Sequence, residues 1–147
     1  MAERTIDLAS RDGFTIPQEE AIADGAITPG MLLALQSTGK LKANATAAKK
    51  IRCVVAVENE LFSKVIADAY ADGDRVFAKT FPPGAPFYGF LDAGETTSKG
   101  SKLVPSTGGT FKVASTGVDD FHVMAEAQEA VDLATSTSTG RIILKAI

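Results

Sequence analysis

Glycine and proline residues with turn-forming neighbours recur about every 8 to 12 residues along this chain, and they limit the length of any helix or strand. Pro29-Gly30 and Pro83-Gly84 have the order that a type II turn requires. Proline fixes φ at the first central position, and glycine supplies a positive φ at the second. Such spacing is typical of an all-β barrel or sandwich, so we expect a mainly β fold.

The clearest strand pattern lies in residues 51–57, an apolar run that we place in the core with alternate side chains on opposite faces. Residues 37–40 form a tight return, which predicts that Leu41 pairs back toward Leu35. The other segments that we expect as strands are residues 31–36, 75–80, 87–91, 100–104, 110–114, 121–126 and 141–147.

Two segments favour a short helix. Residues 18–23 follow Pro17, which suits the first helical position, and precede Gly25, which suits a stop. Residues 58–70 place apolar side chains at helical spacing, and we expect a helical turn and a loop there.

The 147 residues suffice for one domain with a real core. Residues 1–24 are polar and mixed, and we interpret them as an extended N-terminal arm in which apolar residues are isolated anchors. Residues 25–147 carry the strand and turn patterns and form a single β-barrel-like domain.

Charge and hydropathy exclude several partners. The net charge is −3 and the basic residues are scattered, so no basic stripe exists to bind nucleic acid directly. No apolar run approaches the roughly 20 residues that span a membrane, and the N-terminus does not resemble a signal peptide. A protein made and used in a cytoplasm fits these features.

Few side chains offer chemistry. His122, the only histidine, falls in an expected strand, where a partly exposed imidazole is more common than a catalytic one. Cys53 lies in the apolar run 51–57, where burial raises the pKa of a thiol. Asp68, Asp72 and Asp74 lack the spacing of a calcium loop, which favours turns over a weak cation site. We therefore expect no enzymatic activity, no cofactor and no metal site.

The order of several segments resembles a known family. These segments are residues 25–33, residues 51–57, Ala69-Tyr-Ala-Asp-Gly-Asp-Arg-Val76, Phe81-Pro-Pro-Gly84, Asp92-Ala-Gly94, residues 125–131 and Arg141-Ile-Ile-Leu. As a whole the chain from about Gly25 onward is similar to the small head decoration, or cement, proteins of tailed bacteriophages.

That resemblance implies a small β-barrel or β-tulip that sits on the outer surface of the capsid in the virion, as a homotrimer at three-fold positions. Its partner would be a major capsid protein of the HK97-type fold, and each subunit would stabilise contacts between neighbouring capsid proteins. The N-terminal arm would then be loose in the free protein and ordered on the shell. The residues expected to contact the capsid or another subunit are Ile6, Leu8, Phe14, Ile16, Phe81, Phe87 and Tyr88.

The main alternative is a β-sandwich module that binds a ligand or receptor, such as a glycan or a host surface. Sugar sites commonly stack rings on aromatic side chains. The chain has no tryptophan and only two tyrosines, Tyr70 and Tyr88, which lowers this alternative.

Overall fold

Both Pro-Gly pairs form tight turns in the computed structural model, which describes residues 3–115, 117 and 119–147. Met31 N–H donates to Thr28 O at 3.1 Å across the first turn, and Ala85 N–H donates to Pro82 O at 3.0 Å across the second. Gly30 and Gly84 have φ values of 102° and 90°. The turns predicted from these pairs are therefore confirmed.

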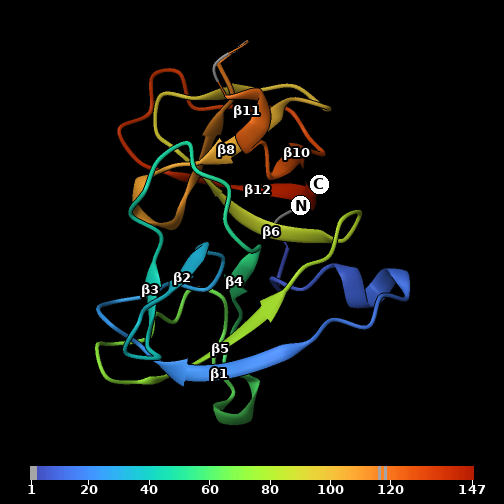
Figure 1. Ribbon diagram of the computed structural model, residues 1–147. Helices are drawn as coiled ribbons and strands as arrows, with labels where there is room; N and C mark the ends of the chain where they lie inside the picture. The colour runs from blue at the N-terminus through green and yellow to red at the C-terminus, as the bar shows by residue number, and fades with distance from the viewer. Residues whose placement is uncertain (1–2, 116, 118) are drawn as a thin grey trace.

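The strands form two groups, which Figure 1 shows one above the other. The upper group is a closed barrel in which the neighbours follow the order β10, β12, β6, β9 and β8. Its strands are β6 (Pro86–Leu91), β8 (Lys102–Pro105), β9 (Phe111–Val113), β10 (Ala125–Ala127) and β12 (Gly140–Ala146). A separate two-stranded pair consists of β7 (Thr96–Thr97) and β11 (Val131–Asp132).

The lower group holds an antiparallel sheet and a hairpin. The sheet contains β1 (Gln18–Ile22), β5 (Arg75–Thr80) and β4 (Val54–Ala56), in that order. The hairpin consists of β2 (Leu33–Leu35) and β3 (Leu41–Ala43), and Leu35 is opposite Leu41 as the sequence predicted. The mainly β fold and the barrel are thus confirmed.

Helical structure in the described residues is limited to 3₁₀ segments, so the short helices expected from the sequence are no longer than one turn or so. These segments are η1 (Ala9–Asp12), η2 (Glu60–Phe62), η3 (Thr107–Gly109) and η4 (Asp120–His122). The helical turn expected within residues 58–70 is η2. None of these helices has the length and apolar character needed to cross a bilayer.

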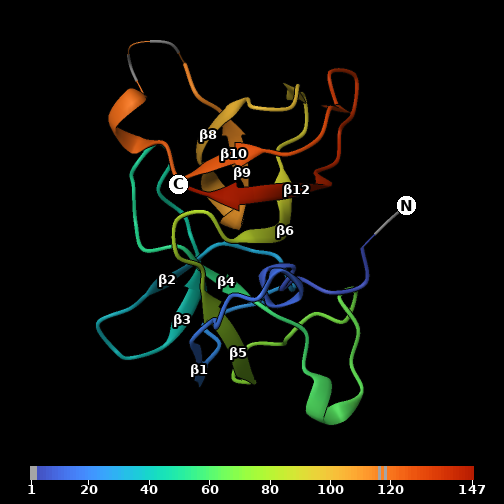
Figure 2. The same ribbon diagram turned by 90° about the vertical axis from the view of Figure 1, so that its right-hand side faces the viewer.

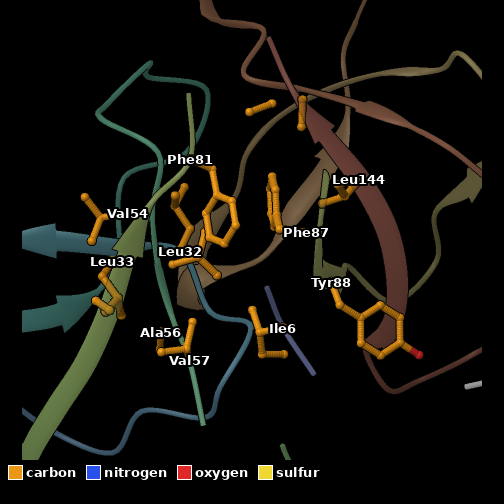
Figure 3. Close-up of a cluster of buried hydrophobic side chains, with 14 of the residues drawn as sticks. Ile6, Leu32, Leu33, Val54, Ala56, Val57, Phe81, Phe87, Tyr88 and Leu144 are labelled. Carbon is orange, nitrogen blue, oxygen red and sulfur yellow. The ribbon is translucent and has the colours of Figure 1, made fainter. Parts of the chain in front are cut away.

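The core lies where the two strand groups meet (Figure 3). The rings of Phe81 and Phe87 face each other there, with centroids 5.1 Å apart. Val54 and Val55 are both buried, so β4 is covered on both faces. Residues 54–57 therefore lie in the core as expected, and the strand itself spans Val54–Ala56. The start of the expected strand differs, because Arg52 is exposed and Ile51 and Cys53 are only partly buried.

The helix predicted for residues 18–23 is wrong, because Gln18–Ile22 forms β1. β1 pairs antiparallel with β5, with Glu19 opposite Ala78 and Glu20 opposite Phe77. Hydrogen bonds to a distant strand replace those of a helical turn, and cross-strand packing overrides the helix preference of this local sequence.

The strand predicted for residues 121–126 is only partly correct. Its first residues belong to η4, and β10 begins at Ala125. His122 therefore lies in a 3₁₀ turn and not in mid-strand. The sequence also gave no indication of β7 or β11, which have two residues each and too little pattern to detect.

Candidate interaction surface

The N-terminal segment, residues 3–24, is packed against the rest of the chain. Ile6 is fully buried and Leu8 is 3% exposed. Ile6 O accepts a hydrogen bond from Tyr88 N–H at 3.0 Å, and Ile6 N–H donates to Glu58 Oε2 at 3.2 Å. The arm expected to be loose in the free protein thus supplies core side chains and strand β1.

Phe14 and Ile16 differ from the two earlier anchors. Phe14 is 37% exposed, and Ile16 is half-buried against the core. Both follow η1, where the chain turns at Gly13 with a φ of 85°. They keep apolar surface that another protein could cover.

The three aromatic residues expected as contacts lie mainly inside the chain. Phe81 is 3% exposed, Phe87 is fully buried and Tyr88 is 8% exposed. Figure 3 shows Tyr88 directed away from the Phe81–Phe87 pair. Contact with another protein stays a prediction for all seven residues, but in this structure only Phe14 and Ile16 among them offer appreciable surface for it.

Arg141 joins the barrel to the lower group. Its guanidinium carbon lies 4.2 Å from the centroid of the Phe90 ring, and its nitrogens donate to Pro29 O at 2.7 Å and Ile66 O at 2.8 Å. Burial lowers the pKa of Arg141 from its usual value. A stacked guanidinium with two carbonyl acceptors fixes the Pro29-Gly30 turn and the loop that carries Ile66.

The loop between β4 and β5 carries the most prominent exposed apolar group in the lower half of the molecule. Leu61, Phe62 and Val65 are 78%, 73% and 57% exposed. We call these three side chains the apolar knob. Hydrogen bonds within the loop hold it in shape: Lys64 N–H donates to Asn59 O at 3.0 Å, and Val65 N–H donates to Asp68 Oδ2 at 2.8 Å.

A polar cleft of about 400 Å³ lies between this loop and the N-terminal segment. Its lining includes Asp7, Glu58 and Lys79. Lys79 Nζ lies 2.6 Å from Asp7 Oδ2, and Thr5 Oγ1 donates to Glu58 Oε1 at 2.5 Å. Asp7 is thus paired with Lys79, and Glu58 is bound to the Thr5 hydroxyl and the Ile6 N–H, which indicates that these charged groups stabilise the N-terminal segment.

A second concavity, the apolar groove, lies between β2 and the start of β4. It has a volume of about 300 Å³ and is lined by Leu33, Ala34, Leu35, Ile51, Arg52 and Val54. Leu35 is 62% exposed at its edge. The groove is therefore an open apolar surface on the hairpin side of the lower group.

The groups considered for chemistry have structural roles in the described residues. Nδ1 of His122 accepts a hydrogen bond from Lys50 N–H at 3.4 Å. Burial raises the pKa of Cys53 to about 12, in the direction predicted from the sequence. Across the parts of the chain that are described, no cluster of His, Cys, Asp or Glu has the arrangement of a metal site.

The three aspartates that were compared with a calcium loop act in turns. The carboxylate of Asp72 accepts from Gly25 N–H at 2.8 Å, and that of Asp74 accepts from Ala71 N–H at 2.8 Å. Asp68 accepts from Val65 N–H within the knob loop. Each carboxylate caps a backbone donor, which confirms the interpretation as turn residues.

Neither the knob nor the groove was predicted from the sequence as an exposed surface. The helical spacing of Leu61, Phe62, Val65 and Ile66 predicted a helical turn and a loop and did not indicate whether these side chains are exposed. One signal was present: Leu61-Phe62 is an apolar pair between Asn59-Glu60 and Ser63-Lys64, and so short an apolar run among polar residues suits an exposed turn. The groove has no sequence signal, because residues from β2 and β4 meet only in the folded chain.

Comparison with known proteins gives a fold likeness. No protein-family model matches the sequence. No curated protein matches it either. Among solved structures, the chain is similar to the N base of head fiber gp8.5 in bacteriophage phi29, with a TM-score of 0.60. The match has 16% sequence identity and covers 90% of this chain and 95% of that chain, so the two share a fold over nearly their whole lengths.

Proposed function

We propose that this chain is a structural protein of a tailed-phage head, where it binds the outer surface of the capsid and acts as a decoration, or cement, protein. The observation that carries the proposal is the fold shared with the head fiber base over 90% of this chain. The order of turns and strands that resembles decoration proteins supports it independently of that fold comparison.

The surface of the molecule suits adhesion. The lower group exposes the apolar knob, the apolar groove and part of Phe14. Covering this apolar surface with another protein is favourable, because it removes the surface from water. Cys53 is held as a thiol by its raised pKa, and His122 is used in a hydrogen bond to the backbone. We therefore propose that the protein functions by binding, without a chemical step.

As a cement protein, each subunit would contact neighbouring major capsid proteins of the HK97-type fold at a three-fold position. Specific interfaces of this kind cover on the order of 800 Å² on each partner. Apolar burial at about 25 cal/mol per Å² then opposes separation of the capsid proteins under the pressure of the packaged DNA. Three copies around the axis multiply that effect through their simultaneous attachment.

Co-sedimentation tests this proposal directly. The purified chain is mixed with expanded shells and with unexpanded procapsids of the phage that encodes it, and the pelleted fraction is measured. Binding to expanded shells with saturation at a fixed number of copies is the expected result. Binding to neither particle would contradict the proposal and favour a ligand- or receptor-binding module.

A point substitution tests the N-terminal segment better than its deletion. Removing residues 1–16 would also remove Ile6 and Leu8 from the core, so lost binding would only report lost folding. Phe14→Asp changes a side chain that is already 37% exposed. Reduced capsid binding by Phe14→Asp, in a protein that still unfolds in one cooperative transition, is expected if this part of the segment contacts the shell.

A further inference from the structure

The apolar knob protrudes from the molecule, and the apolar groove is concave. The knob presents Leu61 and Phe62 on a turn that projects from the lower group, and both side chains are more than 70% exposed. The groove is an apolar concavity of about 300 Å³, large enough to receive a phenylalanine ring. One chain therefore carries both a protruding and a receiving apolar surface.

The charges around the two surfaces are also complementary. The border of the knob is acidic on balance, since the exposed side chains beside it are Glu60, Asp68 and the basic Lys64. Exposed basic side chains surround the groove: Lys42 on β3, opposite Ala34 of the groove, and Lys49 and Lys50 before β4. Arg52 also lies there, but it is paired with Glu19 at 3.0 Å. An acidic border facing a basic border favours the approach of the knob to the groove and fixes their relative orientation.

The knob is held in the shape that insertion requires. Ile66 O accepts a hydrogen bond from Arg141, which anchors the base of the loop to the barrel. Ser63 ends η2 with a φ of 55° and donates its N–H to Glu60 O at 3.1 Å. Binding would thus cost little conformational entropy, because the loop is ordered before it makes the contact.

The two surfaces lie apart on the molecule, so a chain cannot fill its own groove. Figure 2 shows η2 and the β2–β3 hairpin on opposite sides of the lower group. A protruding surface on one side and its receptor on the other produce a heterologous contact, in which each copy uses a different surface toward each neighbour. Such contacts close into a ring when the rotation between copies allows it.

We propose that copies of this chain associate head to tail, with the knob of one copy inserted into the groove of the next. Phe62 and Leu61 then pack against Leu33, Leu35 and Ile51 of the neighbour. The acidic residues beside the knob face the basic residues beside the groove. This inference concerns the contact between copies and does not depend on capsid binding, so the two proposals can fail separately.

The experiment uses two full-length variants that each remove one side of the contact. Leu61→Asp combined with Phe62→Asp charges the knob and leaves the groove intact. Leu35→Glu charges the edge of the groove and leaves the knob intact. All three positions are more than 60% exposed, so the fold tolerates the changes. Phe121→Asp, at a side chain that is 88% exposed in η4, is the matched control.

Size-exclusion chromatography with light scattering gives the mass over a concentration series. The unmodified chain and Phe121→Asp are expected to form the same oligomer, and each interface variant alone is expected to be monomeric. An equimolar mixture of the knob and groove variants retains one intact contact. It should therefore give a species of twice the monomer mass and nothing larger. Raised salt should weaken the association, since it screens the charged borders.

Three results would overturn the proposal. One is a monomeric unmodified chain at every concentration. Another is that the knob variant and the groove variant each still form the oligomer of the unmodified chain. The third is a mixture of the two variants that stays monomeric. If the knob variant instead loses capsid binding while the unmodified chain is monomeric, the knob contacts the capsid protein and not a second copy.

Discussion

The carboxylate of Asp7 accepts a hydrogen bond from Lys79 Nζ at 2.6 Å, which ties the N-terminal segment to strand β5. The two side chains are 7% and 22% exposed, so solvent screens the pair only weakly. Burial alone would raise the pKa of Asp7, but hydrogen bonds from Lys79 and Ser10 outweigh it and hold the pKa below its usual value. The segment is thus fixed to the domain by a buried charge as well as by apolar side chains.

Asp7→Asn should lower the free energy of unfolding by about 1 to 3 kcal/mol at neutral pH, because Lys79 loses its charged partner. The folded pKa of Asp7 lies below the unfolded value of about 3.9. The stabilisation is therefore complete above that pH and is lost as the pH falls through the folded pKa. Urea denaturation of both proteins between pH 7 and pH ~3 should show the difference shrink only below about pH 4.

Glu20→Gln is the control for this measurement. Its ion pair with Arg75 also connects the N-terminal segment to β5, but the side chains of Arg75 and Glu20 are 66% and 41% exposed. Solvent screens such a pair, so the substitution should change the unfolding free energy by much less. Equal effects of Asp7→Asn and Glu20→Gln would contradict the role assigned to burial.

Ile6→Ala should destabilise the protein by about 3 kcal/mol, because it leaves a cavity at a fully buried position. Phe14→Ala in the same segment should cost clearly less, since 37% of that side chain is already in water. Thermal unfolding followed by circular dichroism compares the two. A loose N-terminal arm would instead make both substitutions nearly neutral.

Gly30→Ala should destabilise the protein by at least about 2 kcal/mol. The φ of Gly30 is 102°, which a side chain disfavours, and an added Cβ would clash with the guanidinium of Arg141 and lie 3.1 Å from Tyr88 O. Gly13→Ala has a similar positive φ of 85° but open space around the Cβ, so it should cost only about 1 kcal/mol. Chemical denaturation of the two variants separates backbone strain from the clash.

Arg141→Met should loosen the knob loop as well as destabilise the fold. The substitution leaves Pro29 O and Ile66 O without their donor and removes the cation above the Phe90 ring. We expect a loss of about 2 to 4 kcal/mol. Relative to the unmodified protein, hydrogen exchange should accelerate more in residues 59–68 than in β12. An equal acceleration over the whole chain would argue against a local role.

Cys53 should react with a thiol reagent only when the protein opens. Its pKa of about 12 leaves almost no thiolate at pH 8 in the folded state, whereas an unfolded cysteine has a pKa of about 8.5. Labelling by an aromatic disulfide reagent should be slow in buffer and fast in denaturant. Rapid labelling of the folded protein would contradict the raised pKa of this thiol.

Part of this fold can be predicted from residues that are close together in the sequence. Pro29-Gly30 and Pro83-Gly84 favour a turn through their own backbone preferences. The proline ring fixes φ at the first central position, and glycine, which has no Cβ, accepts a positive φ at the second. The pairing of Leu35 with Leu41 needs only a short return between them. The strands at residues 75–80 and 141–147 were predicted from their own side chains, and β5 and β12 lie there.

The sequence did not predict β1 or the surfaces of the molecule. Glu19 and Glu20 are good helix formers and show no alternation, yet they lie in a strand because β5 offers backbone partners. Their exposed ion pairs with Arg52 and Arg75 add little to this. Those partners are more than thirty residues away in the chain. No local pattern can contain that information.

The sequence by itself therefore determined the class of fold, a mainly β chain punctuated by turns, since strand alternation and turn geometry depend on near neighbours. Tertiary structure alone decided which apolar residues are core and which are surface. Ile6 and Phe62 both lie in short apolar stretches among polar residues, but one is fully buried and the other is 73% exposed. The difference arises because burial depends on which strands pack over a side chain. Those strands are distant in the sequence, so only the complete fold determines them.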